Sequence, residues 1–268
     1  MTRLDSSAAW TQAARMVSAN REMLAAIAGV FFLLPGLIGA VVLPKPMINR
    51  GMSDQQMAEA FTKFYGDAGP TLALLSLPLI VGFMTMLVIM LDDRRPTVAV
   101  AIGQSLRMLP SYLAAHIVTM LAFSLAWLLL ASVLLLALPA VLAVLLSIAA
   151  MTYPLTLVLM VAPEIAVAQT RNPFVAIRRS LTLTRGQFQA IMLYFAPAFT
   201  LFLVIYGLVM MVVGVVLVNT TEGEAQRLIS ETVVGLLFAV GYTYFAAMIA
   251  STHRQLAGDV AATRDVFD

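Results

Sequence analysis

Long stretches with almost no charged residue alternate with short stretches that carry the charges. A membrane-spanning helix needs about 20 mainly apolar residues to cross about 30 Å of hydrocarbon. The 111–162 block is too long for one span, and Leu138-Pro139 supplies a turn between two. The pattern predicts an all-α polytopic membrane protein, with one integral membrane domain over 1–268. Its six spans are expected at 23–44, 70–91, 111–138, 139–162, 187–218 and 228–251.

Segments between the spans mix apolar residues at helical spacing with arginine, which is typical of amphipathic helices that lie in the membrane interface. Two of these predicted surface helices cover 97–109 and 174–186. In the second, Phe174, Ile177 and Leu181 form an apolar stripe with the arginines beside it, and Thr184 continues that stripe. Both segments are predicted to rest on the bilayer.

Two further amphipathic helices are predicted nearer the N-terminus. The first follows Ser6 or Ser7, either of which can cap it, and its stripe consists of Trp10, Ala13, Ala14 and Val17. The second covers 53–65 with Ser53 or Asp54 as its cap, and its stripe consists of Met57, Phe61 and Phe64. An interfacial helix over the mouth of a hairpin is favoured for 53–65 over a partner-binding site.

An internal repeat organises the chain. PLIVGFM at 78–84 recurs as PLTLVLM at 154–160, and AIGQSL at 101–106 recurs as AIRRSL at 176–181. The matches are collinear and fall in the same context, a span followed by a surface helix. They predict three parallel units, each made of one surface helix and two spans.

Prolines and small residues within the spans predict details of their packing. Pro35, Pro78, Pro154 and Pro197 are expected to kink their helices. Close helix contacts are expected at small residues of the first and fifth spans: Gly29, Gly36, Gly39, Ala40, Gly207 and Gly214.

Composition narrows the class of protein further. Of the 268 residues, 61% are hydrophobic and 11% are charged, against about 45–50% and 25% in soluble domains. This composition argues against a soluble enzyme and against a disordered chain. Zero cysteines exclude a disulfide framework, and a net charge of +2 gives no surface for nucleic acid.

The distribution of lysine and arginine predicts the orientation. The side that holds both termini carries 12 of the 16 basic residues. Because basic loops stay in the cytoplasm, both termini are predicted to be cytoplasmic. The 12 are Arg3, Arg15, Arg21, Arg94, Arg95, Arg107, Arg171, Arg178, Arg179, Arg185, Arg254 and Arg264.

Arginines in the connecting segments are candidates for binding anionic lipid headgroups. The alternative is that they only set the topology, and the sequence leaves both open. The candidates are Arg94, Arg95, Arg107, Arg171, Arg178, Arg179 and Arg185.

Ionisable residues inside spans would point to transport or catalysis, because they are costly to insert. His116, one and a half turns into the third span, and Glu164, at the end of the fourth, are the residues that qualify as functional polar groups. Glu164 is expected to pair with Arg171 or Arg178, or to cap the turn, and the ends of the sixth span place Glu231 and His253 within reach of water. No pattern for a catalytic centre, a metal site or a cofactor emerges.

The sequences APEIAVAQ (162–169) and PFVAIRRSLTLTRGQF (173–188) resemble the YciC-like bacterial inner-membrane proteins, which overlap the membrane domain of glycerophosphoryl diester phosphodiesterases. The matching positions are Glu164, Pro173, Arg179, Ser180, Leu183, Thr184 and Gly186, with Ala9, Trp10, Asn20 and Arg21 near the N-terminus. The resemblance implies a six-helix inner-membrane protein without an agreed activity. Hydrolysis would require the soluble catalytic barrel of about 250 residues, for which this chain has no segment.

Two functional hypotheses follow. The first is a non-enzymatic integral membrane protein, either an envelope- or lipid-linked accessory or an assembly partner. Its partners would be membrane lipids, including anionic ones, and other membrane proteins or a second copy of the chain. The alternative is a transporter or exporter of an apolar or amphipathic, lipid-like substrate, because such cargo needs no buried charge.

Overall fold

The computed structural model describes residues 4–43, 51–168, 171–220 and 223–264, and these residues form helices and connecting turns, without a strand. The predicted all-α class is confirmed. In chain order the elements are α1 (Ser6–Ala19), α2 (Arg21–Ala28), the π-helix η1 (Gly29–Leu33), α3 (Leu34–Val42), α4 (Asp54–Leu91), α5 (Val98–Ala137), α6 (Ala140–Val158), α7 (Val161–Ala168), α8 (Pro173–Thr184), α9 (Phe188–Thr220) and α10 (Gly223–Arg264).

Six segments of the described chain are long and apolar enough to cross a membrane, as predicted. They are Arg21–Val42, Asp54–Leu91, Val98–Ala137, Ala140–Ala168, Phe188–Thr220 and Gly223–Gly258. Each predicted span falls on one of them, although residue 44, the predicted end of the first span, lies outside the described residues. The protein is therefore a polytopic membrane protein with an all-α fold.

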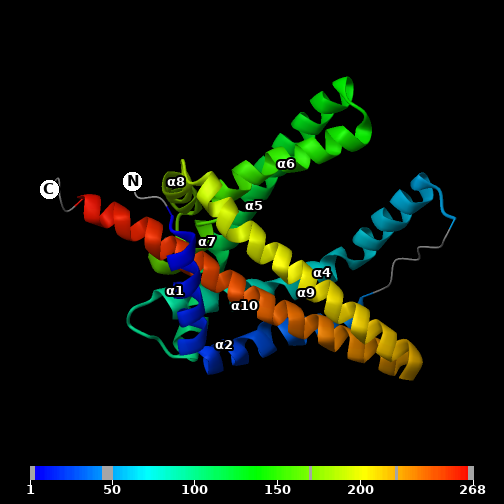
Figure 1. The fold of residues 1–268 in the computed structure, drawn as a ribbon, viewed down its shortest axis with the longest axis horizontal. Coiled ribbons are helices and arrows are strands. Elements are labelled where there is room, and N and C mark those ends of the chain that lie inside the picture. The colour runs from blue at the N-terminus through cyan, green and yellow to red at the C-terminus, as the bar shows by residue number, and fades with distance from the viewer. Residues whose placement is uncertain (1–3, 44–50, 169–170, 221–222, 265–268) are drawn as a thin grey trace.

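The first described helix, α1, and the end of the last, α10, lie at the same end of the bundle, as six crossings require (Figure 1). We call this the basal end. It also contains the turn at 92–97 and helix α8. The opposite end, with the α5–α6 turn at 138–139, is called the distal end (Figure 1).

Two predicted surface helices are continuous with the spans that follow them, which corrects their predicted boundaries. The segment 53–65 forms the cap and first part of α4, and 97–109 forms the cap and first part of α5. Each continues into its span without an interruption. Pro70 and Pro110 lie inside these helices. A proline removes one backbone hydrogen bond, which kinks a helix but need not end it. Ser53 caps α4 as predicted, in a capping box with Gln56.

The first span is built from three pieces because of a proline. Pro35 has no N–H to donate to the carbonyl four residues earlier, so the regular pattern cannot continue through it. The preceding turn widens into the π-helix η1, in which the N–H of Leu34 donates to Gly29 O. Pro35 thus distorts the helix as predicted.

Helix α1 packs on α10, with Ala9, Ala13 and Met16 buried in the contact. The predicted apolar stripe of α1 differs from this buried face, because two of its members, Ala14 and Trp10, are exposed, Trp10 at 44%. Trp10 instead stacks on the α10 side chain Tyr244, with ring centroids 6.3 Å apart.

The N-cap of α1 also differs from the prediction. Asp5, not Ser6 or Ser7, accepts hydrogen bonds from the N–H groups of Ser7 and Ala8, at 2.9 and 3.0 Å. A carboxylate at the N-cap stabilises the helix dipole as well as the free N–H groups, which gives Asp5 the advantage.

The basal ends of three spans form the centre of the molecule. Residues 84–91 of α4, 161–166 of α7 and 246–253 of α10 are buried without interruption. We call these three segments, with the side chains packed on them, the basal core. A helix that is buried on every side must be apolar or internally satisfied all round, and these segments contain mainly Ala, Met, Ile, Leu and Val.

One further helix covers each segment of the basal core. The start of α5 packs on α4, α8 packs on α7, and α1 packs on α10. Each covering helix buries a small residue completely, namely Ala101, Ala176 and Ala9. The pattern is cyclic in chain order: α5 and α8 each pack on the span that precedes them, and α1, the first covering helix, packs on the last span.

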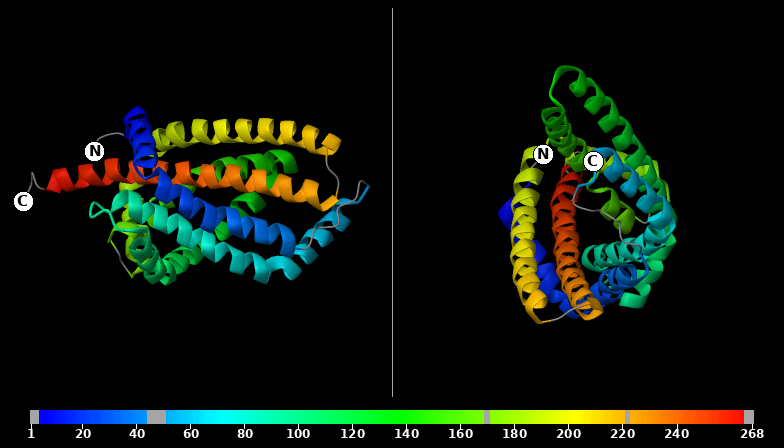
Figure 2. Two further views of the ribbon diagram at one scale, coloured as in Figure 1. Left: turned by 90° about the horizontal axis from the view of Figure 1, so that it is seen from below. Right: turned by 90° about the vertical axis from the view of Figure 1, so that its right-hand side faces the viewer.

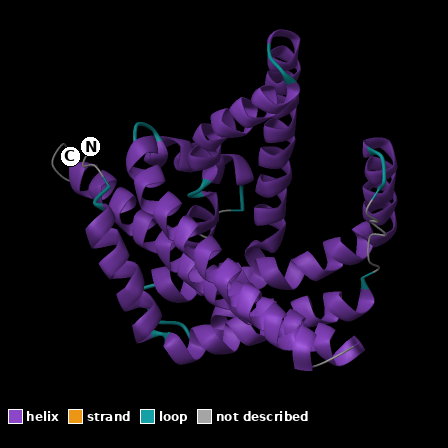
Figure 3. Ribbon diagram, turned by 45° about the vertical axis from the view of Figure 1, so that its right-hand side comes forward, coloured by secondary structure: helices purple, strands orange, loops and turns teal. Residues whose placement is uncertain are grey.

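Distal to this core the α5–α6 hairpin diverges from the other spans, whereas α9 and α10 stay packed, for example through Phe202 and Phe238. The α5–α6 hairpin stands apart from the other spans at its tip (Figure 2 and Figure 3). Its outer residues are highly exposed, with Leu128 at 60% and Leu136 at 89%. Within the hairpin, the indole N–H of Trp127 donates to Ser147 Oγ at 3.1 Å, joining α5 to α6.

Most of the close helix contacts occur at glycines that were not predicted. A Cβ added at Gly82, Gly235 or Gly241 would collide with a side chain of a neighbouring helix. Of the predicted positions, Gly39 lies near Leu75, whereas open space surrounds the remaining glycines: Gly29, Gly36, Gly207 and Gly214.

Candidate functional site

The fourth span is broken near its basal end, between α6 and α7. Leu159 and Met160 form a turn between the two helices. Pro163 has no N–H to donate to Leu159 O, so the helical pattern of α6 cannot continue there. A new helix starts with the N–H of Glu164 bonded to Met160 O at 3.1 Å. We call the segment 157–160 the span break.

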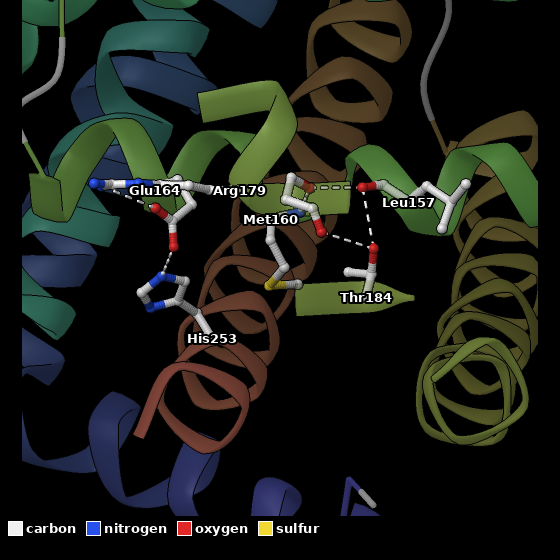
Figure 4. A network of polar contacts seen from close by, with 7 residues as sticks. Leu157, Met160, Glu164, Arg179, Thr184 and His253 are labelled. Atoms are coloured by element: carbon white, nitrogen blue, oxygen red, sulfur yellow. Dashed lines mark hydrogen bonds and ion pairs between the residues drawn. The ribbon is translucent and has the colours of Figure 1, made fainter. Parts of the chain in front are cut away.

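Two hydroxyls of α8 satisfy backbone groups at the span break (Figure 4). Ser180 Oγ donates to Leu157 O at 2.7 Å and accepts from the N–H of Met160 at 3.1 Å. Thr184 Oγ1 reaches the same carbonyl at 3.2 Å. Buried backbone groups without partners are costly, so α8 stabilises the break.

The sequence around α8 fixes where this helix begins and ends. Asn172 Oδ1 accepts from the N–H of Phe174 at 3.0 Å, and Pro173 occupies the first turn, where its missing N–H costs nothing. At the other end, Gly186 has a φ of +77°, a conformation that glycine adopts without steric cost. These limits place Ser180 and Thr184 opposite the span break.

A cluster of ionisable groups lies next to the break. Glu164 Oε1 is 2.9 Å from His253 Nε2, and the two side chains are only 10% and 7% exposed. Glu164 Oε2 lies 3.7 Å from Arg179 Nη1 (Figure 4). The arginine side chain is 55% exposed, so water screens this second contact, and the contact with His253 is the stronger one.

The cluster joins three helices that are distant in the sequence. Glu164 belongs to α7, Arg179 to α8 and His253 to α10. A buried carboxylate with one hydrogen-bonding partner, His253, and one ion-pair partner, Arg179, holds its helices in one arrangement, because removal of His253 leaves a buried polar group unsatisfied. The cluster can therefore join α7, α8 and α10 through one hydrogen bond and one ion pair.

This geometry corrects the predicted partner of Glu164. Arg171 and Arg178 are exposed and take no part in the cluster, whereas Arg179, one position further along α8, faces α7. His253 was expected near water and is buried instead. Since 89 residues separate Glu164 from His253, spacing alone gave no sign of their contact.

The other headgroup candidates are exposed at the basal end. Arg94 lies 3.7 Å from Asp92, while Arg95 and Arg107 are exposed without an ion pair among the described residues. Arg254, which was not a candidate, donates to Met90 O at 2.9 Å and to Asp93 at 3.1 Å. Three of the basic residues used to predict orientation, Arg3, Lys45 and Arg50, lie outside the described residues.

His116 is not part of the Glu164 cluster. It is exposed on α5, and its ring stacks on Tyr112 with centroids 6.0 Å apart. Within the described chain, no group of three or more potential metal ligands comes together. An apolar depression of about 570 Å³ runs along one face of α9 between Met192 and Val204, around Pro197.

Comparison of the chain with protein-family models, with curated proteins and with solved structures finds no match.

Proposed function

We propose that this chain is a non-enzymatic integral protein of a bacterial cytoplasmic membrane, an accessory that works through bound lipid or through a membrane partner. The observation that carries the proposal is the division of the molecule. Exposed arginines surround a closely packed basal core, and apolar side chains cover the distal helices. Arginine beside apolar surface is suited to anionic lipid.

The use of the ionisable residues supports a non-enzymatic role. Glu164 and His253 contact each other and are buried, so they serve to join helices. His116 is separate from them and stacks on a tyrosine. The covering helices support the proposed three-unit repeat, because α1, the start of α5 and α8 each pack on one segment of the basal core.

We also propose that the basal end faces the cytoplasm and that the chain is a YciC-like protein. Eleven described arginines lie at the basal end and one, Arg227, at the distal end with Lys63, which supports this orientation. The structural roles of Glu164, Arg179, Ser180 and Thr184 give a physical reason for the motif behind the resemblance. A periplasmic reporter fused after Asp268 should be inactive, and activity would overturn the orientation.

Transport of a lipid-like substrate is the second candidate, and the span break favours it. Interrupted membrane helices form the binding sites of many transporters. Against it, the depression on α9 is apolar and open to the surroundings, rather than enclosed between the units.

The test is mass spectrometry of lipids and proteins retained by the full chain through purification in mild detergent. We expect enrichment of an anionic phospholipid or of one membrane protein over its share in the membrane. Retention in bulk proportions would contradict the proposal. In a second assay, vesicles that contain the protein should not accelerate transbilayer movement of a fluorescent phospholipid; acceleration would establish the transport alternative.

A further inference from the structure

Helix α8 has two faces with different tasks. Its inner face buries Ala176, Ser180 and Thr184, and the two hydroxyls hold the span break. Its outer face exposes Phe174 at 65% and Leu181 at 39%. The inner contacts are satisfied within the protein, whereas the outer face has apolar side chains without cover.

The outer face also carries two arginines. Arg178 and Arg185 follow Phe174 and Leu181 by one helical turn each, so the four side chains form a single stripe. Neither arginine has an ion pair among the described residues, in contrast to Arg179 with Glu164. Alternating guanidinium and apolar side chains are complementary to phosphate groups above acyl chains.

The position of α8 along the bundle places this stripe at headgroup depth. Helix α9 starts at Phe188, three residues after Arg185, and has no charged residue over its 33 residues. Hydrocarbon therefore begins close to Phe188, whose ring contacts Tyr153 of α6 with centroids 5.4 Å apart. Aromatic residues are enriched at this level of a membrane.

The stripe and the hydroxyls lie on α8 and its C-cap residue Arg185, so they move together. Arg178 and Arg185 flank Ser180 and Thr184 in the sequence, and α8 is only 12 residues long. A lipid that binds the outer stripe better when α8 is seated on the break shifts the equilibrium toward the seated state. The seated state in turn fixes the end of α6, and with it the direction of the α5–α6 hairpin.

We infer that an anionic phospholipid headgroup binds the stripe of Phe174, Arg178, Leu181 and Arg185, and that its binding holds α8 on the span break and sets the direction of the distal hairpin. The inference rests on the proposed lipid-linked function and adds its site and its effect. It requires lipid at the stripe and movement at the hairpin, which are separately measurable.

The first measurement is lipid selection by the full chain in nanodiscs of equal phosphatidylglycerol and phosphatidylcholine, followed by native mass spectrometry. The wild type is expected to retain phosphatidylglycerol preferentially. Arg178→Gln with Arg185→Gln should reduce the preference about 30-fold, given the contribution of each arginine at an anionic surface. The control, Arg94→Gln with Arg95→Gln, removes the same amount of charge from the same end of the protein. It should retain most of the preference for phosphatidylglycerol.

The second measurement is the distance between spin labels on the hairpin tip and on distal α9. The chain has no cysteine, so Leu136→Cys and Val218→Cys, at 89% and 71% exposed sites, introduce the only thiols. We expect a narrow distance distribution in phosphatidylglycerol and a broader one in phosphatidylcholine. The Arg178/Arg185 variant should be broad in both lipids.

Ser180→Ala separates the two parts of the inference. It should retain phosphatidylglycerol as the wild type does, yet give a broad distribution in both lipids. If it cannot be purified, Thr184→Val, which removes one of the three contacts, should broaden the distribution partly. A distribution equal to that of the wild type in the purified variant would overturn the coupling.

The outcomes distinguish this inference from the proposed function. Phosphatidylglycerol selection by the wild type without a change in distance overturns only the coupling of lipid to the hairpin. Undiminished selection by the Arg178/Arg185 variant overturns the site. Absence of any lipid or protein partner contradicts the proposed function itself.

Discussion

Helices α4 and α5 are neighbours with the same hydrophobic character and opposite packing. The most apolar windows of the two have mean hydropathies of 2.5 and 2.4, yet 56% of the first window is buried and only 6% of the second. Hydropathy measures the preference for leaving water, and lipid and protein satisfy that preference equally. It locates a span without saying what surrounds it.

Small and hydroxyl-bearing side chains distinguish the two environments better. Next to the basal core, η1 approaches α4 closely at Gly82, and within the core Thr85 of α4 donates to Ser105 of α5 at 3.2 Å. The distal hairpin presents large aliphatic side chains such as Leu128 to its surroundings. In lipid, the hydrophobic effect does not drive helices together. Van der Waals packing at closely approaching backbones, and hydrogen bonds between helices, drive their association instead.

Glu164→Ala tests the basal core with the largest expected effect. The change leaves His253 buried without its partner, and removal of one member of a buried pair costs about 3–5 kcal/mol. Thermal unfolding in detergent, followed by tryptophan fluorescence, measures it. Glu231→Ala in the distal part of α10 is the control and should cost less than about 0.5 kcal/mol. Equal effects at the two sites would refute the structural role of the cluster.

A pair of leucine truncations compares the regions directly. Leu87 is completely buried in α4, and its replacement by alanine should cost about 2–5 kcal/mol through lost contacts and a cavity. Leu128→Ala on the exposed hairpin should change stability by less than about 0.5 kcal/mol. A large loss at Leu128 would mean that the hairpin packs against a protein surface, such as a second copy.

Glycine substitutions give a smaller contrast. A Cβ at position 82 meets Phe31, so Gly82→Ala should destabilise by about 1–3 kcal/mol through overpacking. Gly207→Ala has open space around it and should stabilise α9 by up to about 1 kcal/mol. Chemical denaturation of both variants in mixed micelles measures the difference, and the same sign at both positions would contradict it.

The smallest expected effect concerns one hydrogen bond. Thr85→Val keeps the shape of the side chain and removes the bond to Val81 O within α4 as well as the bond to Ser105 of α5. Bonds between membrane helices average about 0.6 kcal/mol. Thr200→Val is the matched control, because Thr200 bonds only within α9, to Ala196 O. The two variants should differ by that amount in the same unfolding assay, and a larger loss for Thr200→Val would contradict the assignment.

The sequence was sufficient for the number and order of the spans, since the cost of burying charge in lipid leaves an almost unambiguous pattern. It was insufficient for helix boundaries at Pro70 and Pro110, where a kink and an end look alike. The span break was also missed, because it depends on hydroxyls supplied by another helix.

The candidate site was predicted only in part. Glu164 was selected because ionisable residues in spans are costly to insert, and it was expected to pair with an arginine; the structure pairs it with Arg179 and His253. Its partners depend on which helices meet, and the choice between Arg178 and Arg179 depends on a rotation of 100° around α8. His253 and Glu164 lie at the basal ends of two predicted spans, and therefore at a similar depth in the membrane. This similar depth was the one feature of the sequence that indicated their contact.

The docking of α1 on α10 has a consequence for the order of assembly. The N–H of Asp5 donates to Gln255, which lies 250 residues later in the chain. At ribosomal rates of about 5–20 residues per second, roughly 12–50 seconds pass before the α10 surface on which α1 packs has been made. The helix that is synthesised first is therefore among the last to be packed. During that interval its apolar side is accessible to membrane insertion factors or chaperones.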